Sequence, residues 1–294
     1  MGFPEHVGLD QLIHHRFHVM VQLPWASTRS APGAGSILAR SVGGFVTAGI
    51  MGCATANPSR EALTSDRPDF TESTATMKRG EVQLEGGDTF EHVASVKTNT
   101  IGELLLRIGL GSRAELRIEP GSYTTVRSPD GDGSGWVDAA LGTKLRLYEP
   151  RDERPSIVPA VSLLVLTSVP TGSSEFRQTK LQPEAKLAAE WTLSDRIGVA
   201  TNVNVSRPRD DENGRYTVFE GSVSFGFDLT SRLGAYTEVF GFAPQLSKVG
   251  HSRYGNTGLT FSLTPDYQMD LRGGMGFNGA HPDYFVGAGL VHRW

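Results

Sequence analysis

The chain ends on the sequence YFVGAGLVHRW, residues 284–294, and the alternation of side chains in this stretch decides the fold. Tyr284, Val286, Ala288 and Leu290 occupy every second position. In an extended strand successive side chains point to opposite faces, so a period of two predicts a β-strand with one apolar face. The final residue, Trp294, falls on that same face. The chain is therefore expected to finish with a strand whose last side chain is aromatic.

The same period recurs through most of the chain. In TIGELLLRIGL, residues 100–110, Leu104 and Leu106 fall on one face and Glu103 and Arg107 on the other. Twelve strands are expected, near residues 81–91, 96–110, 114–125, 136–148, 156–168, 181–192, 196–206, 215–228, 232–242, 252–262, 267–277 and 283–294. The even number would leave both ends of an antiparallel sheet on one side.

The connections between these strands alternate in length. Short polar turns are expected at 111–113, 193–196, 229–232 and 263–266, with a less tight one at 149–155. Longer polar connections are expected at 128–135, 170–181, 207–215, 244–253 and 278–283. Short turns at one end and long loops at the other are typical of an up-and-down transmembrane β-barrel, whose short turns are periplasmic and whose longer loops are extracellular.

Composition agrees with an all-β protein, since the 294 residues include 35 Gly and 38% hydrophobic residues. The net charge of -4 gives no basic face, so no nucleic-acid partner is expected. A soluble β-sandwich would show the same alternation, but it must protect its edge strands, whereas a closed barrel has none.

Aromatic residues near the expected strand ends favour a membrane barrel, because such residues form girdles at the two interfaces. They are Trp136, Tyr148, Trp191, Phe240, Phe242, Tyr284 and Trp294. A terminal aromatic such as Trp294 is also the usual assembly signal of bacterial outer-membrane barrels. The expected partners are therefore outer-membrane lipid and the barrel-assembly machinery.

The first 56 residues have the character of a targeting sequence rather than of a folded domain. Basic residues precede the small, apolar stretch SVGGFVTAGIMGCATA, residues 41–56, which ends in an A-x-A pattern. This order predicts a signal peptide that is cleaved after Ala56 and a protein exported to the bacterial outer membrane. Residues 1–19 look like excess length before a start at Met20. Cys53 leaves lipidation open as an alternative to removal. Residues 57–79 would then form a periplasmic N-terminal segment and residues 80–294 the barrel.

The polar face of the strands would line the lumen. The expected lumen residues are Glu103, Arg107, Glu115, Arg117, Glu119, Asp138, Lys144, Arg146, Glu184, Lys186, Glu190, Glu220, Glu238, Asp270 and Arg272. Because both signs of charge are present, cross-strand pairs can form. Two interpretations follow: charges that pair and hydrate the interior, or a constriction that selects solutes.

Several motifs resemble an outer-membrane barrel family labelled "transporter" or "putative MetA-pathway of phenol degradation". They include TSDRPDFTES at 64–73, VQLEGG at 82–87, ELLLRIGL at 103–110, VPTGS at 169–173 and FVGAGL at 285–290. The resemblance covers about residues 64–294, and its first motif is fairly specific. It implies a passive channel for small solutes, with aromatic or other hydrophobic compounds as the substrates.

The motif Asp66-Arg67-Pro68-Asp69 precedes the first strand and is itself a poor strand, because Pro68 cannot donate to a ladder. It is expected under or within the periplasmic mouth, with Arg67 paired to a lumen carboxylate. A structural latch and a plug are both possible roles.

No enzyme, metal site or cofactor is expected. The chain shows no serine elbow, no metal-spaced His pair and no phosphate-binding Gly loop. The sequence therefore predicts an outer-membrane channel for small-molecule solutes. The alternatives are a structural or loop-binding barrel whose lumen is closed by ion pairs, and a soluble secreted β-sandwich.

Overall fold

The computed structural model describes residues 63–151, 157–210, 214–243, 251–277 and 284–294. The predicted signal peptide, its cleavage at Ala56 and Cys53 lie outside the described residues. Among the described residues no helix is long and apolar enough to cross a membrane.

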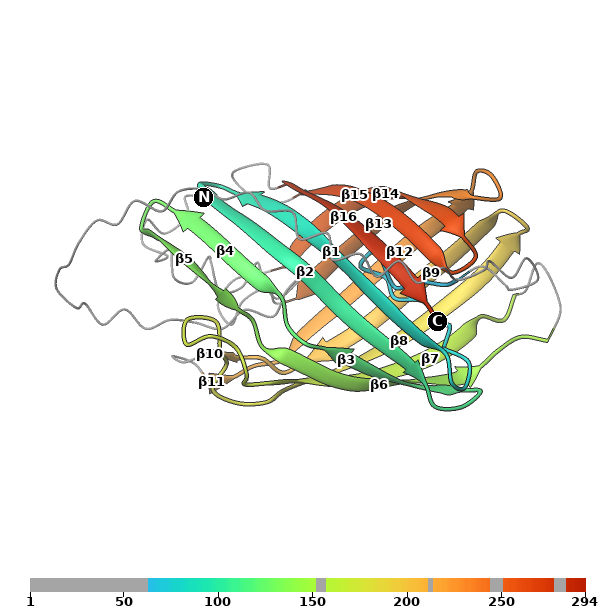
Figure 1. The fold of residues 1–294 in the computed structure, drawn as a ribbon, viewed down its shortest axis with the longest axis horizontal. Coiled ribbons are helices and arrows are strands. Elements are labelled where there is room, and N and C mark those ends of the chain that lie inside the picture. The colour runs from blue at the N-terminus through green and yellow to red at the C-terminus, as the bar shows by residue number, and fades with distance from the viewer. Residues whose placement is uncertain (1–62, 152–156, 211–213, 244–250, 278–283) are drawn as a thin grey trace.

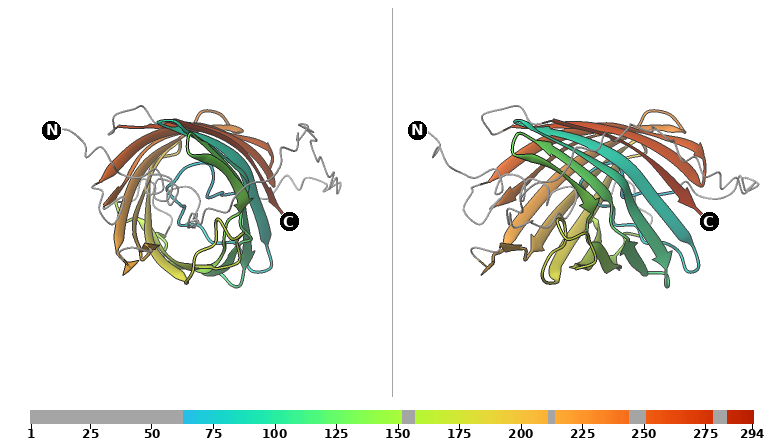
Figure 2. Two further views of the ribbon diagram at one scale, coloured as in Figure 1. Left: turned by 90° about the vertical axis from the view of Figure 1, so that its left-hand side faces the viewer. Right: turned by 60° about the vertical axis from the view of Figure 1, so that its left-hand side comes forward.

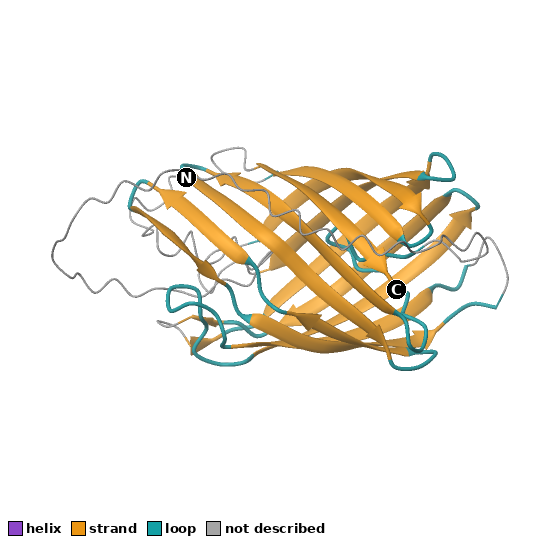
Figure 3. Cartoon of the chain, in the orientation of Figure 1, coloured by secondary structure: helices purple, strands orange, loops and turns teal. Residues whose placement is uncertain are grey.

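The described residues form a closed antiparallel barrel (Figures 1 and 3). Its strands are β1 (Val82–Val93), β2 (Val96–Gly109), β3 (Ala114–Glu119), β4 (Tyr123–Ser128), β5 (Gly131–Trp136), β6 (Ala139–Tyr148), β7 (Ala160–Val169), β8 (Gln182–Ser194), β9 (Ile197–Ser206), β12 (Val218–Asp228), β13 (Leu233–Ala243), β14 (Ser252–Thr264), β15 (Tyr267–Gly276) and β16 (Tyr284–Arg293). The first strand pairs with both β2 and β16, which closes the ring. The closed ring excludes the soluble sandwich.

The prediction of twelve barrel strands is confirmed, with two of them interrupted. Both β3 and β4 pair with β2, while β6 pairs with β3 and β5 with β4. The strand expected at 114–125 breaks where Pro120 lacks an N–H and where Gly121 has a φ of +93°.

The expectation of a long loop at 128–135 is wrong. Most of it is strand β5, which pairs with β4 from Gly131 to Trp136. The alternating glycines there have the composition of a loop, but Gly135 instead leaves room for the packed side chains of Phe176 and Ser173. A further short ladder, β10 (Arg209–Asp210) with β11 (Gly214–Arg215), lies in the long connection expected at 207–215.

A β-bulge in β2 sets which side chains face inward. Gly102 has a φ of +97° and Glu103 a φ of +28°, and the register with β1 shifts by one residue beside them. An extra residue on one strand reverses the alternation beyond it. Before the bulge, the even-numbered residues Thr98 and Thr100 face inward. After it, the odd-numbered residues Glu103 and Arg107 face inward.

The two faces of the wall differ as the alternation predicts. Large apolar side chains such as Leu141, Val203 and Leu271 are exposed on the outside, whereas buried polar residues face the lumen. Of the seven aromatic residues expected in girdles, Trp136, Tyr148, Tyr284 and Trp294 are exposed and Trp191 is half-buried, but the expectation is wrong for two residues. Phe240 and Phe242 are only 2% and 4% exposed. They share the alternation of the buried Glu238 and point inward.

Candidate functional site

Residues 63–79, here called the plug segment, run inside the barrel (Figure 2). The segment begins at the turn end of the barrel, where the Leu63 N–H donates to the Pro265 carbonyl at 3.1 Å. It returns to that end, where the Gly80 N–H donates to the Gly109 carbonyl at 3.1 Å, before β1 starts. The described part of the segment expected at 57–79 thus lies within the barrel at its turn end, and the expected pairing of Arg67 with a lumen carboxylate is confirmed. Inside the barrel, the inward-facing polar side chains of the strands offer this segment ion-pair and hydrogen-bond partners that it would lack in the periplasm.

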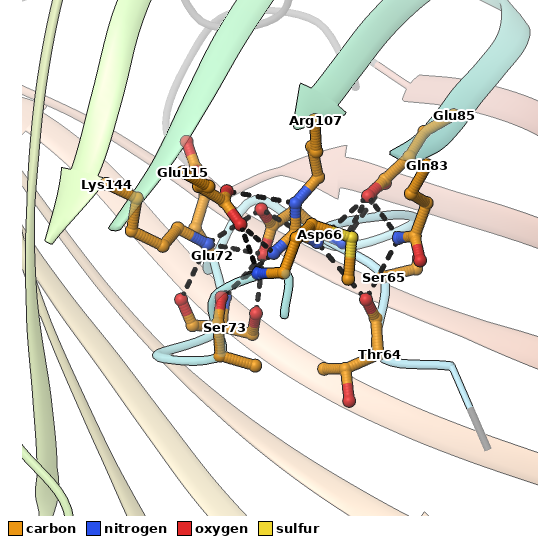
Figure 4. A network of polar contacts seen from close by, with 12 residues as sticks. Thr64, Ser65, Asp66, Glu72, Ser73, Gln83, Glu85, Arg107, Glu115 and Lys144 are labelled. Carbon is orange, nitrogen blue, oxygen red and sulfur yellow. Dashed lines mark hydrogen bonds and ion pairs between the residues drawn. The ribbon is translucent and has the colours of Figure 1, made fainter. Parts of the chain in front are cut away.

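Asp66 is the centre of the contacts between plug and wall (Figure 4). Its carboxylate accepts from Lys144 Nζ at 2.8 and 3.0 Å and from Arg117 Nη1 at 2.5 Å. It also forms an ion pair with Arg107 at 3.4 Å. Within the plug segment, the Ser73 N–H and hydroxyl donate to it at 2.9 and 2.7 Å. Burial opposes ionisation, but the three cations hold the pKa of Asp66 well below its usual range.

The cations around Asp66 are shared with further carboxylates. Arg107 contacts Glu115 at 3.0 Å and Glu85 at 3.1 Å, and all three of these side chains are fully buried. Arg117 and Lys186 each bind Glu72 of the plug segment at 2.8 Å. Buried charges are tolerated only when they are paired and hydrogen-bonded, so this network depends on every member.

Arg67 forms a second anchor on the neighbouring part of the wall, made by β2, β1, β16 and β15. Its guanidinium pairs with Glu103 at 2.9 Å and with Asp270 at 3.4 Å. Two wall glycines make room for it: a Cβ on Gly87 would lie 2.2 Å from Arg67 Nη2, and a Cβ on Gly289 would lie 2.4 Å from Arg67 Nε. The glycines therefore form a cradle in which only the absence of side chains lets the guanidinium lie against the wall.

Wall carboxylates also bind the plug backbone. Glu238 accepts from the N–H groups of Phe70 at 2.9 Å and Thr71 at 2.6 Å. Glu190 accepts from the Thr74 N–H at 3.0 Å and from its hydroxyl. Because these carboxylates satisfy backbone donors that would otherwise be orphaned inside the barrel, the plug segment needs no regular secondary structure.

The two aspartates of the motif have opposite electrostatic surroundings. Burial and the nearby Glu238 carboxylate raise the pKa of Asp69 well above its usual range, whereas the pKa of Asp66 is lowered. Pro68 contributes its carbonyl, which accepts from Arg272 Nη1 at 3.1 Å. Asp66, Arg67 and Pro68 of the motif thus each contact the wall directly.

The fifteen residues expected in the lumen divide into two groups. Those that contact the plug segment are Glu103, Arg107, Glu115, Arg117, Lys144, Arg146, Lys186, Glu190, Glu238, Asp270 and Arg272. Glu119, Asp138, Glu184 and Glu220 line a remaining cavity of about 240 Å³ beside the plug segment. Asp138 also accepts from the N–H groups of Thr171, Gly172 and Gln178, and so holds the loop after β7.

An aromatic wall, defined as Phe240, Phe242, Tyr254 and Phe285, faces the lumen toward the loop ends of β13, β14 and β16. Phe70 of the plug segment packs against it, with its ring centroid 4.7 Å from that of Phe240. This cluster was not expected from the sequence. The signal was available, because Phe240 and Phe242 share the alternation of Glu238.

Comparison with known proteins shows what this architecture resembles. The family described as "Putative MetA-pathway of phenol degradation" matches residues 65–294. Among solved structures, the COG4313 outer membrane channel from Pseudomonas putida F1 is 11% identical at a TM-score of 0.57, covering 74% of this chain and 97% of that one. The NanC porin is 8% identical at a TM-score of 0.51, covering 71% and 98%. The comparison with curated proteins gives no match. The fold is that of a bacterial outer-membrane barrel.

We predict that Asp66→Asn weakens the hold on the plug segment, because Arg107, Arg117 and Lys144 lose their shared counter-charge. Breaking a buried pair from one side costs about 3–5 kcal/mol. In planar bilayers the variant should show larger or more frequent openings, and urea unfolding in detergent should show lower stability. Asp195→Asn, in an exposed turn, is the control. Unchanged currents with Asp66→Asn would contradict the role of this carboxylate.

We also predict that Gly289→Ala acts through Arg67. The added Cβ would push the guanidinium away from Glu103 and Asp270, so the current across planar bilayers should rise. In the double variant with Arg67→Ala, the glycine substitution should add nothing, because coupled residues are non-additive. Gly226→Ala, where a Cβ meets nothing within 4 Å, is the control. Additive effects of the two substitutions would show that the cradle serves another purpose.

Proposed function

We propose that this chain, which belongs to the family described as "Putative MetA-pathway of phenol degradation", is an outer-membrane channel that its own plug segment closes at rest. Small solutes, aromatic compounds among them, pass when the segment moves aside. The observation that carries the proposal is the polar attachment of residues 63–79 to an otherwise complete barrel. Transport is passive, and the strand that ends at Trp294 serves as the signal for assembly.

The character of the attachment supports movement. The plug segment is bound by ion pairs and by hydrogen bonds to carboxylates, including those at Asp66, Arg67 and Glu238. Water can replace such contacts as the lumen hydrates, because hydrogen bonds to protein are exchanged for hydrogen bonds to water. An apolar core packed against the wall would lack this replacement. The segment is therefore a closure that can be released without unfolding the barrel.

Aromatic solutes are proposed from two observations. The family description concerns phenol degradation. Independently, the aromatic wall faces the lumen. A lumen that passed only ions would need charged side chains and no such rings. A polar channel with one aromatic patch can admit water-soluble molecules and still favour those with a ring.

The second candidate is a structural barrel whose lumen stays closed by its ion pairs. The density of buried pairs around Asp66 and Arg107 favours it. The two candidates differ in whether the plug segment leaves the lumen. A reversible lock on the segment separates them.

We predict that a disulfide between Thr71→Cys and Ser222→Cys stops conduction. The hydroxyl oxygens of Thr71 and Ser222 lie 2.8 Å apart, so cysteines at these positions can be bridged. With Cys53 replaced by Ser, the oxidised variant should show no openings in planar bilayers, and a reductant should restore them. Each single cysteine variant is a control for the substitutions themselves. Equal currents before and after reduction would exclude the plug segment as the closure, and absence of current in all variants would favour the structural barrel.

A further inference from the structure

Three rings of the aromatic wall, Phe240, Phe242 and Tyr254, contact one another, and Phe70 of the plug segment stacks on Phe240. Phe70 lies 4.7 Å from Phe240 at an interplanar angle of 18°, and Phe240 lies 5.2 Å from Tyr254 at 14°. Phe242 meets Phe70, Phe240 and Tyr254 edge-on, at 5.5, 6.0 and 6.3 Å. Stacked faces flanked by a ring edge are the geometry that aromatic quadrupoles prefer.

Phe70 differs from the rest of the stack in its exposure and origin. The four wall rings come from strands and are buried, whereas Phe70 comes from an irregular segment and is only partly buried. It also lines the remaining cavity, together with Glu220 and Lys186. The Phe70 ring is therefore the one member of the stack that a molecule in the cavity can reach.

The Phe70 ring is coupled to the attachment of the plug segment. The Phe70 and Thr71 N–H groups both donate to Glu238, which lies two residues before Phe240 on β13. The ring contact and the backbone contacts thus converge on one stretch of one strand. Ring and backbone at residue 70 therefore anchor the plug segment to the same stretch of β13, and a solute that removes the ring contact removes part of that anchorage.

We propose that the position of the Phe70 ring on Phe240 is a binding site for the planar ring of an aromatic solute, and that a solute taking this position displaces Phe70 and loosens the plug segment. The proposal deepens the proposed channel function and rests on it. The ligand class is a single aromatic ring, because a flat π-face fits parallel to Phe240 with its edge contact to Phe242. A saturated ring of similar size fills space but lacks the face and the quadrupole.

The direct test measures binding of phenol and of cyclohexanol to the full chain in detergent micelles, by equilibrium dialysis. Phe70→Ala removes the competing ring, so its affinity for phenol should rise at least tenfold over the wild type. Cyclohexanol should bind more weakly than phenol to this variant. Phe219→Ala, at an exposed position on the outer face, controls for partition into detergent and should leave phenol binding unchanged.

A second substitution tests the wall. Adding Phe240→Leu to Phe70→Ala should abolish the gain in phenol affinity, and circular dichroism together with heat-modifiable gel migration checks that the barrel is folded. Tyr254→Leu in the same background replaces Phe240→Leu if the latter does not fold, since Tyr254 stacks on the far side of Phe240. Equal phenol affinity of Phe70→Ala and the wild type, equal affinity for the two ligands, or retained affinity without the wall ring would each overturn the proposal.

The coupling between solute binding and movement of the plug segment is tested by measuring currents in planar bilayers. Phenol should increase the open probability of the wild type, should do so less in Phe70→Ala, where the plug segment is already loosened, and should have no effect on the oxidised Thr71→Cys/Ser222→Cys variant. Binding that changes in dialysis as expected, without any effect of phenol on wild-type current, would overturn the coupling to the plug segment. Failure of the channel function itself is distinguishable, because then no variant conducts while the dialysis results stand.

Discussion

The buried Asp66 carboxylate, bound by Arg107, Arg117 and Lys144, is the interaction on which the rest of the lumen depends. These cations come from three different strands, β2, β3 and β6, and without a counter-charge they would lie close together inside a narrow barrel. The wall carboxylates Glu85 and Glu115 neutralise part of this charge, and Asp66 of the plug segment contacts all three cations. The wall and the plug segment are therefore electrostatically incomplete without each other, which explains why the segment lies inside the barrel rather than beneath it.

Local backbone features place the partners of this segment. The bulge at Gly102 turns Glu103 inward, where it pairs with both Arg67 and Arg272. Gly87 and Gly289, on adjacent strands, remove the side chains that would occupy the position of Arg67. Irregularities that cost a strand some stability, a bulge and interior glycines, are here the means of shaping a site.

Much of the fold could be predicted from the sequence, because a barrel wall imposes its period of two on every strand. Positions such as Arg107, Lys144 and Asp270 fall on the inner face by alternation alone. Three features could not be derived that way. Alternation does not reveal where an extra residue enters a strand, so the bulge at Gly102 was not expected. A glycine-rich stretch such as 131–136 has the composition of a loop even though it pairs. The contacts of Asp66 with the three cations join residues 41 to 78 positions apart, and no local pattern encodes such a pairing.

The central claim is that residues 63–79 are held inside the lumen by wall carboxylates and cations. Amide hydrogen exchange of this segment in the folded barrel tests it most directly, because the Phe70, Thr71, Thr74 and Met77 N–H groups all donate to wall carboxylates. These four amides should exchange far more slowly than those of the exposed turn around Asp195 and should be protected almost as well as strand amides. Exchange as fast as in that turn would show that the segment is not held in the barrel and would contradict the account.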